Sequence, residues 1–258
     1  MTLNREQMLI EMGIRPLWAL REAAPAPALH AVPAPADDTP PASGQTAAAQ
    51  DQTAPAAATG AAVPTANLAA DPATLAWPEL AGAIRACRAC GLCERRRQAV
   101  PGVGDMQADW LFIGEGPGSE EDARGEPFVG AAGQLLDAML AALDLTRQKA
   151  VYIANAVKCR PPGNRTPESG EIEACRPWLQ RQIVLLQPKI IVLLGKTAAQ
   201  SLLGKQDRLA DLRRQIFDYE GIPVVVTYHP AYLLRNLPDK AKAWEDLLRA
   251  RRLLRAAG

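Results

Sequence analysis

Four runs of apolar residues along the chain alternate with segments that have the spacing of amphipathic helices. The apolar runs cover residues 108–115, 150–158, 188–195 and 222–229. The helical patterns cover residues 131–144, 168–187, 196–204 and 239–257. Strands that are apolar throughout and alternate with helices are typical of a parallel sheet covered on both faces. The pattern predicts an α/β fold with three α/β/α layers and a small parallel sheet of about four strands.

The residues upstream of this pattern divide into two parts. Residues 4–22 have the spacing of a short amphipathic helix. Residues 24–72 are mostly Ala, Pro, Thr and Asp, and they lack the large apolar side chains that offset chain entropy. We therefore expect a short helix within residues 1–23, a disordered linker over 24–72 and one folded domain over 73–258.

Two further helix predictions concern this domain. A helix over residues 75–85 leads into a group of cysteines. Thr166, followed by Pro167, is expected to be the N-cap of the helix over 168–187, because a hydroxyl cap and a first-turn proline favour helix starts.

The charge of the chain is unevenly distributed. Residues 76–258 carry 26 Lys and Arg against 21 Asp and Glu, whereas residues 1–75 carry 3 against 7. A mildly basic C-terminal part permits a polyanionic partner. The chain has no run of about 20 apolar residues, and its N-terminus lacks the pattern of a secretory signal peptide. We expect a cytoplasmic protein that does not enter a membrane and that acts as a monomer.

Three of the four predicted strands end in unusual polar or glycine-rich sequence. The first is followed by GEGPGSEED, the second carries Asn155 and continues into KCRPPGNRTP, and the fourth is followed by His229. The third ends in a plain turn at Gly195 that leads into a helix. Because ligands of parallel sheets bind beyond the carboxyl ends of the strands, we expect a site at this edge.

The five cysteines favour a ligand site over disulfides, because their number is odd and the chain has no export signal. Cys87-x2-Cys90 can turn two thiolates toward one centre, and Cys159 and Cys175 could complete a four-thiolate site. Zinc is one interpretation, although zinc ribbons usually offer two such pairs. Buried thiols without a ligand are the other alternative, and the better one for Cys93.

The turn after the first strand holds a carboxylate between two glycines, Gly114-Glu115-Gly116. A phosphate-binding turn would avoid this negative charge, although a plain tight turn would also use glycine. A carboxylate here can orient a water molecule or stabilise a cationic transition state. The acidic residues 120–122 fit the first turn of a following helix.

Three further features allow a functional and a structural interpretation. His229, which follows an apolar strand, could donate a hydrogen bond to developing negative charge, or it could be structural. The loop from Tyr232 to Arg235 could be an apolar wedge with its arginine on phosphate, or a helix start whose leucines pack inward. Phe128 is either a core residue or a stacking platform for a planar ring.

Together these motifs resemble the family 4 uracil-DNA glycosylases, the iron–sulfur members of the uracil-DNA glycosylase superfamily. The resemblance rests on Cys87-x2-Cys90, GEGPGSEED, GEPFVGAAGQLLD, NAVKCRPPGNRTP, Cys175 and YHPAYLLRN, in that order, and covers residues 76–255. It implies a repair enzyme for uracil-containing DNA. Such an enzyme flips deoxyuridine out of single- or double-stranded DNA and hydrolyses its N-glycosidic bond, leaving uracil and an abasic site.

The resemblance also implies a role for each matched residue. Glu115 would activate the water, and His229 would stabilise charge on uracil O2. Gly114 and Gly116 would let the nucleotide approach, and Phe128 would stack on the base.

Other roles implied by the resemblance concern the uracil edge, the DNA and a cofactor. Asn155 would bind the pairing edge of uracil, and Glu121 would shape the pocket near its C5 position. The DNA wedge would be formed by Tyr232, Leu233, Leu234 and Arg235. The ligands of a [4Fe–4S] cluster would be Cys87, Cys90, Cys159 and Cys175. Cys93 would be a spare thiol.

Other functions fit the same residues. One is a non-catalytic iron–sulfur DNA-binding module of this fold, which would need neither Glu115 nor His229. Another is a glycosylase for a different deaminated base, and a third is a structural zinc protein that binds a nucleotide at the glycine turn. The helix within residues 1–23 suggests docking to a replication or repair protein, although a tolerated extension fits equally well.

Overall fold

The computed structural model describes residues 71–257, so the helix expected within residues 1–23 and nearly all of the expected linker lie outside the described part. The strands are β1 (Val103–Gly104), β2 (Trp110–Gly114), β3 (Val151–Asn155), β4 (Ile190–Leu194), β5 (Ile216–Tyr219) and β6 (Ile222–Thr227). The α-helices are α2 (Trp77–Ala86), α3 (Ser119–Arg124), α4 (Ala131–Ala141), α5 (Ser169–Leu186), α6 (Lys196–Leu203), α7 (Leu209–Leu212), α8 (Pro230–Leu233) and α9 (Asp239–Ala257). Short 3-10 turns are η1 (Pro72–Thr74), η2 (Gly91–Glu94) and η3 (Pro162–Asn164).

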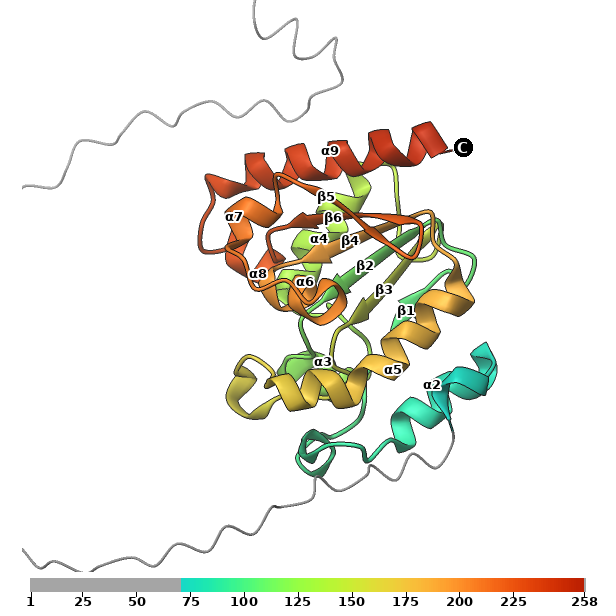
Figure 1. Cartoon of the computed structure of the whole chain (residues 1–258). Coiled ribbons are helices and arrows are strands. Elements are labelled where there is room, and N and C mark those ends of the chain that lie inside the picture. Colours follow the sequence, from blue (N-terminus) through green and yellow to red (C-terminus); the bar gives the residue numbers. More distant parts are fainter. Residues whose placement is uncertain (1–70, 258) are drawn as a thin grey trace, which may run out of the picture. The chain divides into compact units, whose positions relative to one another are not determined.

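The strands form one sheet in the order β1-β3-β2-β4-β6-β5 (Figure 1). The four inner strands are parallel and correspond to the four strands predicted from the apolar runs. The short edge strands β1 and β5, which the apolar pattern does not indicate, pair antiparallel with β3 and β6. In the register, Trp110 of β2 lies opposite Val151 of β3 and Ile190 of β4. The carboxyl ends of all four parallel strands therefore meet at one edge.

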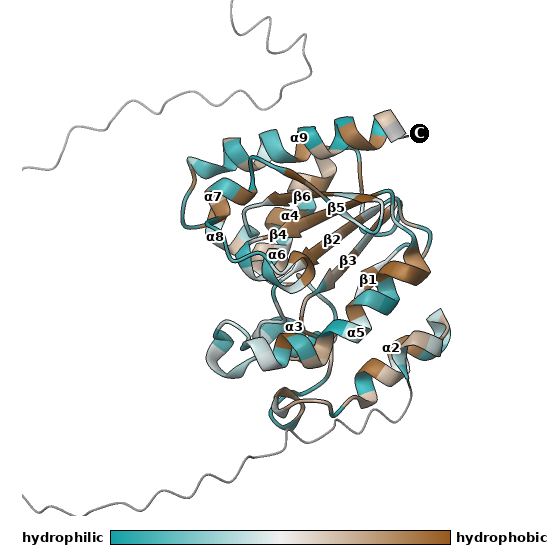
Figure 2. Ribbon diagram, viewed as in Figure 1, coloured by the Kyte–Doolittle hydropathy of each residue, from teal (hydrophilic) through white to brown (hydrophobic). Residues whose placement is uncertain are grey.

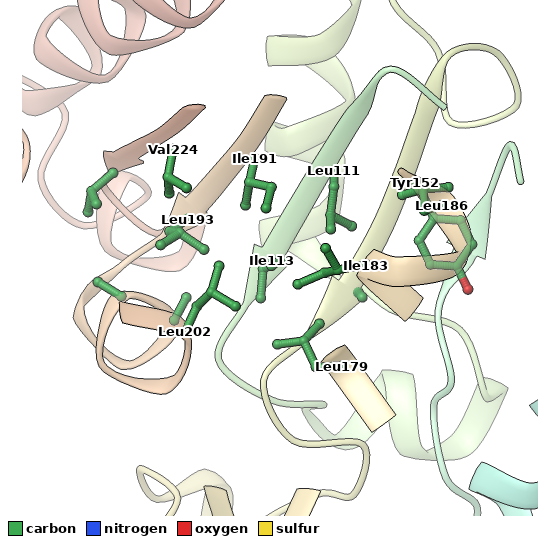
Figure 3. Packing of buried hydrophobic residues seen from close by; sticks show 14 of the residues in the cluster. Leu111, Ile113, Tyr152, Leu179, Ile183, Leu186, Ile191, Leu193, Leu202 and Val224 are labelled. Carbon is green, nitrogen blue, oxygen red and sulfur yellow. The ribbon is translucent and has the colours of Figure 1, made fainter. Parts of the chain in front are cut away.

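Helices cover both faces of the sheet, as the uninterrupted apolar strands predict. One face packs against α5 and α6, where Ile113 and Leu193 meet Ile183 and Leu202 (Figure 3). The other face packs against α4 and α9, and Figure 2 shows the inner strands brown along their length while α9 carries a hydrophilic side. Burial of both faces accounts for the absence of polar alternation in these strands.

A third apolar cluster lies outside the sheet layers. It joins α2 to α5 through Leu80, Ile84 and Trp178 and includes the buried thiols Cys159 and Cys175. The segment that carries the first cysteines is thus packed against the helix that carries the last one.

The predicted N-cap of α5, Thr166, was wrong by two residues. The N-cap is Glu168 and the helix begins at Ser169, so Thr166 and the buried Pro167 precede it. The Glu171 carboxylate accepts the backbone N–H of Glu168 at 2.8 Å, which satisfies a free amide of the first turn. Among the described helices, none is both long and apolar enough to cross a membrane.

Candidate active site

A pocket of about 470 Å³ opens at the carboxyl edge of the parallel strands, where the sequence predicted a site. Its walls come from the turns after β2, β3 and β6, together with the loop between α3 and α4. The lining residues are Glu115, Gly116, Pro117, Gly118, Glu121, Phe128, Ala132, Asn155, Pro161, Asn164, Arg165, His229, Ala231, Tyr232 and Arg235. Segments distant in sequence thus supply one concave, partly polar surface.

Glu115 follows β2 directly and is held by a residue that the sequence analysis missed. The Thr197 hydroxyl, near the start of α6, donates a hydrogen bond of 2.6 Å to Oε2 of Glu115. The backbone carbonyl of Glu115 accepts the N–H of Val157, which continues the β2–β3 pairing past the strand ends. The turn at Gly195, which the sequence did not mark as part of the site, therefore leads into a helix that contacts Glu115. Because β4 lies beside β2, the helix that follows β4 reaches the site. The apolar runs predict the strands but not their order, so they did not point to Thr197.

His229 follows β6 and caps helix α8. Its Nδ1 accepts the backbone N–H of Ala231 at 3.1 Å, so in the neutral ring the proton is on Nε2. Burial lowers the pKa of His229 to about 4, and the positive charge of Arg235 acts in the same direction, while Glu121 acts against both. The site therefore offers a neutral imidazole whose free nitrogen is a hydrogen-bond donor.

Phe128 and Asn155 form an apolar and a polar wall of the pocket. The Phe128 ring packs against His229 with ring centroids 5.4 Å apart. Within residues 71–257, the buried Oδ1 of Asn155 has no hydrogen-bond partner. A side chain at Gly114 would have its Cβ 2.5 Å from that oxygen and 2.6 Å from the Phe128 ring, so glycine keeps this space open. A planar ligand with a polar edge fits such a slot.

Glu121 lines the pocket, but its carboxylate is already engaged. Oε2 accepts the N–H of Gly118 at 3.0 Å, and Oε1 accepts the N–H groups of Val129 and Gly130 at 2.9 and 3.1 Å. Glu121 thus ties α3 to the loop that carries Phe128. A Cβ at Gly116 would lie 2.8 Å from the Val157 side chain, so this glycine permits close packing of the two strand ends.

The four residues expected to form a DNA wedge differ in exposure. Leu233 is only 1% exposed and packs inward, so its assignment to the wedge was wrong and the structural interpretation holds for it. Leu234 is 42% exposed, and Leu237, which the sequence analysis missed, is 60% exposed. Tyr232 stacks on Tyr228 and donates to Asp239 at 2.7 Å, and Arg235 lines the pocket.

All five cysteines line one small cavity beside α2 and α5. Four N–H groups point at three of their sulfurs. Arg96 Nη1 lies 2.8 Å from Cys159 Sγ, and the Lys158 amide lies 3.2 Å from Cys175 Sγ. Trp178 Nε1 and the Ala89 amide lie 3.3 and 3.4 Å from Cys87 Sγ. Burial raises the pKa of Cys159 to about 11 and that of Cys175 to about 12. In the part of the chain that is described, no three His, Cys, Asp or Glu side chains are arranged for a single metal ion.

A buried lysine connects this cavity to the pocket. Lys158 lines the cysteine cavity, while its ammonium donates to the Asn155 carbonyl at 2.9 Å and to Gln182 Oε1 at 2.6 Å. Burial lowers the pKa of Lys158 to about 8, although Cys175 and Cys159 act in the opposite direction. The polypeptide from Asn155 to Cys159 therefore belongs to both sites.

Comparison with known proteins identifies the family. Residues 101–248 match the uracil DNA glycosylase superfamily. A type-4 uracil-DNA glycosylase of Archaeoglobus fulgidus is 43% identical over 159 residues, which cover 58% of this chain and 79% of the relative. Type-4 enzymes of Pyrobaculum aerophilum and Thermotoga maritima are each 41% identical, over 64% and 68% of this chain and 87% and 93% of their own lengths. The chain therefore belongs to the uracil-DNA glycosylase superfamily and, within it, to the type-4 members.

Proposed function

We propose that this protein is a uracil-DNA glycosylase of DNA repair, which hydrolyses the N-glycosidic bond of a flipped-out deoxyuridine. One observation carries the proposal: a carboxylate and a neutral histidine line the same pocket, together with Phe128 and Asn155. Family membership supports it, because the relatives are named for this activity. The catalytic residues are Glu115 and His229.

Glu115 acts on the sugar side of the bond. Thr197 fixes one of its oxygens, so the carboxylate is oriented before substrate arrives. As the bond between C1′ and N1 breaks, the sugar becomes cationic, and a nearby carboxylate stabilises this charge. Glu115 also accepts a proton from the water that adds to C1′.

His229 acts on the leaving base. The electron pair of the broken bond stays with uracil and places negative charge on its O2. The Nε2–H of the neutral imidazole donates to that oxygen, and the bond from Ala231 keeps Nδ1 from carrying the proton. A donor preorganised in this way typically lowers a barrier by about 3 kcal/mol.

The base itself is recognised by shape and by one amide. Phe128 stacks on the ring, and Gly114 leaves room for it. The N3–H of uracil can donate to the Asn155 oxygen that otherwise has no partner in the described residues. Glu121 positions the Phe128 loop and so shapes the side of the pocket where the C5 position of uracil would lie.

We assign the DNA contact to the loop that follows α8. The exposed Leu234 and Leu237 can enter the base stack, and Arg235 can meet a phosphate. Extrusion of the nucleotide costs a few kcal/mol, and less at a mismatched or single-stranded base. Single strands and U:G pairs are therefore expected substrates.

We further propose that Cys87, Cys90, Cys159 and Cys175 hold a [4Fe–4S] cluster. The donor set fits, because four soft thiolates from one Cys-x2-Cys pair and two distant positions line a common cavity. The N–H groups aimed at three of the sulfurs would stabilise thiolates. Such a cluster would supply structural cross-links between α2 and α5. Cys93 remains a spare thiol in this assignment.

Uracil excision by anaerobically purified protein tests the function. The substrate is a labelled oligonucleotide with one uracil, single-stranded or opposite G, and alkali then cleaves abasic sites. Glu115→Gln should slow excision by roughly 10²–10⁴-fold while folding is kept, because the carboxylate is lost without a change of shape. Near-full activity of this variant would overturn the assignment of Glu115.

The same assay separates the alternatives. No cleavage by wild-type protein with full iron content would favour the DNA-binding module, or another lesion such as hypoxanthine or xanthine. Iron and sulfide analysis tests the cofactor: Cys87→Ser should lose the cluster and Cys93→Ser should keep it. Zinc without sulfide would instead indicate the structural zinc protein.

A further inference from the structure

Phe128, the proposed stacking residue, has a backbone conformation that its side chain does not favour. Its φ is +55°, in the left-handed region that residues other than glycine rarely adopt. The residue is nevertheless buried, with 6% of its surface exposed, and its ring packs against His229. Surrounding contacts must therefore hold this conformation.

The loop is held from both sides. On the amide side, Glu121 accepts the N–H groups of Val129 and Gly130. On the carbonyl side, the Arg147 guanidinium donates to the carbonyl of Pro127 at 2.8 Å and also to the carbonyl of Phe128. Nε of the same guanidinium pairs with Asp137 of α4. One planar group thus fixes two consecutive carbonyls and is itself fixed by a carboxylate.

Helix α4 lies close to this loop and so supports the clamp that Glu121 and Arg147 form around it. A Cβ at Gly133 would lie 1.7 Å from the Phe128 carbonyl, so only glycine permits this contact. Arg147 lies in the turn between α4 and β3, outside the pocket lining, and its side chain is 15% exposed. Any influence of Arg147 on a bound base is therefore indirect, and its contacts with the Pro127 and Phe128 carbonyls make Phe128 the nearest route.

We propose that Arg147 is a positioning residue, which sets the plane of the Phe128 ring and thereby the affinity of the pocket for the uracil ring. This inference rests on the proposed function. Lysine could not replace it, because a single ammonium cannot present the planar, two-pronged donor that serves both carbonyls and Asp137. Arg147→Met keeps the apolar stem of the side chain and removes the donors.

A double-mutant cycle tests this role. Excision rate and inhibition by free uracil are measured for wild type, Arg147→Met, Phe128→Ala and the double variant. Arg147→Met should weaken uracil inhibition and slow excision on the order of tenfold, because the Phe128 ring would be displaced. The same substitution should change little when Phe128 is already Ala. Equal effects in both backgrounds, or unchanged uracil inhibition in Arg147→Met, would overturn the proposal.

A control variant and a second readout exclude simpler explanations. Arg208→Met removes an exposed arginine that also pairs with an aspartate, Asp211, and it should leave both measurements unchanged. The NMR shifts of the Phe128 ring, one of only 3 phenylalanines, should move in Arg147→Met and not in Arg208→Met. This readout needs no catalysis, so it distinguishes failure of the clamp from failure of the proposed function. If Arg147→Met does not fold, Arg147→Lys serves in its place.

Discussion

At the residue scale, each of the two side chains that we propose to be catalytic accepts one hydrogen bond from within residues 71–257. Thr197 donates to Glu115, and the backbone of Ala231 donates to His229. Both bonds exist before DNA binds. Groups that are already aligned need no reorganisation as charge develops in the reaction, which is how enzymes gain most from electrostatics.

Thr197→Val should slow uracil excision by roughly 10- to 150-fold, because a hydrogen bond to a charged group contributes about 1.5–3 kcal/mol. Valine keeps the shape of threonine, so the fold should be maintained. Single-turnover excision measures the effect. Ser201→Ala is the matched control, since that hydroxyl is also buried on α6 but donates to the Ala198 carbonyl. If both variants lose activity equally, the loss comes from the helix and not from the contact with Glu115.

The lowered pKa of His229 predicts how the protein responds to acid. An unfolded histidine titrates near pH 6.5, whereas His229 in the folded protein has a pKa of about 4. Between pH 4 and 6.5 the histidine binds a proton in the unfolded state but not in the folded state. The contribution of His229 to stability is therefore complete above pH 6.5 and is lost as the pH falls toward 4.

NMR titration of the imidazole checks this expectation. The chain has 2 histidines, so His30→Gln leaves a single ring signal to follow. Its midpoint should lie near pH 4. A midpoint near 6.5 would mean that the ring is solvated and charged at mildly acidic pH, which would contradict the role of a neutral donor.

At the element scale, the last residue of β2 limits the space that the pocket at the carboxyl edge of the sheet offers to a ligand. Gly114 ends β2, and Gly114→Ala would place a methyl group within 2.6 Å of both Asn155 and Phe128. We expect this change to reduce excision on the order of 100-fold, because a bound base would be displaced. Gly82→Ala is the control, since the exposed Gly82 of α2 has nothing within 4 Å of an added Cβ. That variant should stay fully active and gain about 0.5–1 kcal/mol in the free energy of unfolding.

The elements that sequence could predict are those with a strong local pattern. The four parallel strands and the long helices follow from apolar runs and helical spacing, and so does the edge at which Glu115 and His229 meet. The edge strands β1 and β5 are 2 and 4 residues long and are defined by pairing with a neighbour. Such short strands show no periodicity of apolar and polar residues from which they could be predicted. Leu233 and Arg147 were misjudged or missed for a related reason. Whether a leucine points inward, or an arginine reaches a loop 20 residues away, depends on packing between elements.

At the scale of the whole molecule, the buried apolar residues fall into separate clusters. Two sandwich the sheet, whereas the cluster that contains Cys159 and Cys175 joins α2 to α5. The proposed iron–sulfur cluster would strengthen the third group alone. Stability should therefore depend on metal unevenly across the fold.

Removal of the metal with a chelator should loosen α2 and η2 and leave β4 and β6 protected. Hydrogen exchange, followed by mass spectrometry with and without the chelator, measures this difference. Cys93→Ser, which keeps the assigned ligands, should show the wild-type pattern in the presence of metal. Uniform loss of protection across the sheet would show instead that the metal site supports the entire domain.

The order of strands in the sheet also determines when a newly made chain can first act. Ribosomes add about 5–20 residues per second, and the early strand β2 must wait for β4, whose Ile190 pairs with its Trp110. His229 arrives later still, after β6 and before α8 and α9. A nascent or truncated chain that ends before β6 thus holds Glu115 without His229, its proposed catalytic counterpart. Incomplete synthesis would therefore yield fragments that cannot release bases from DNA.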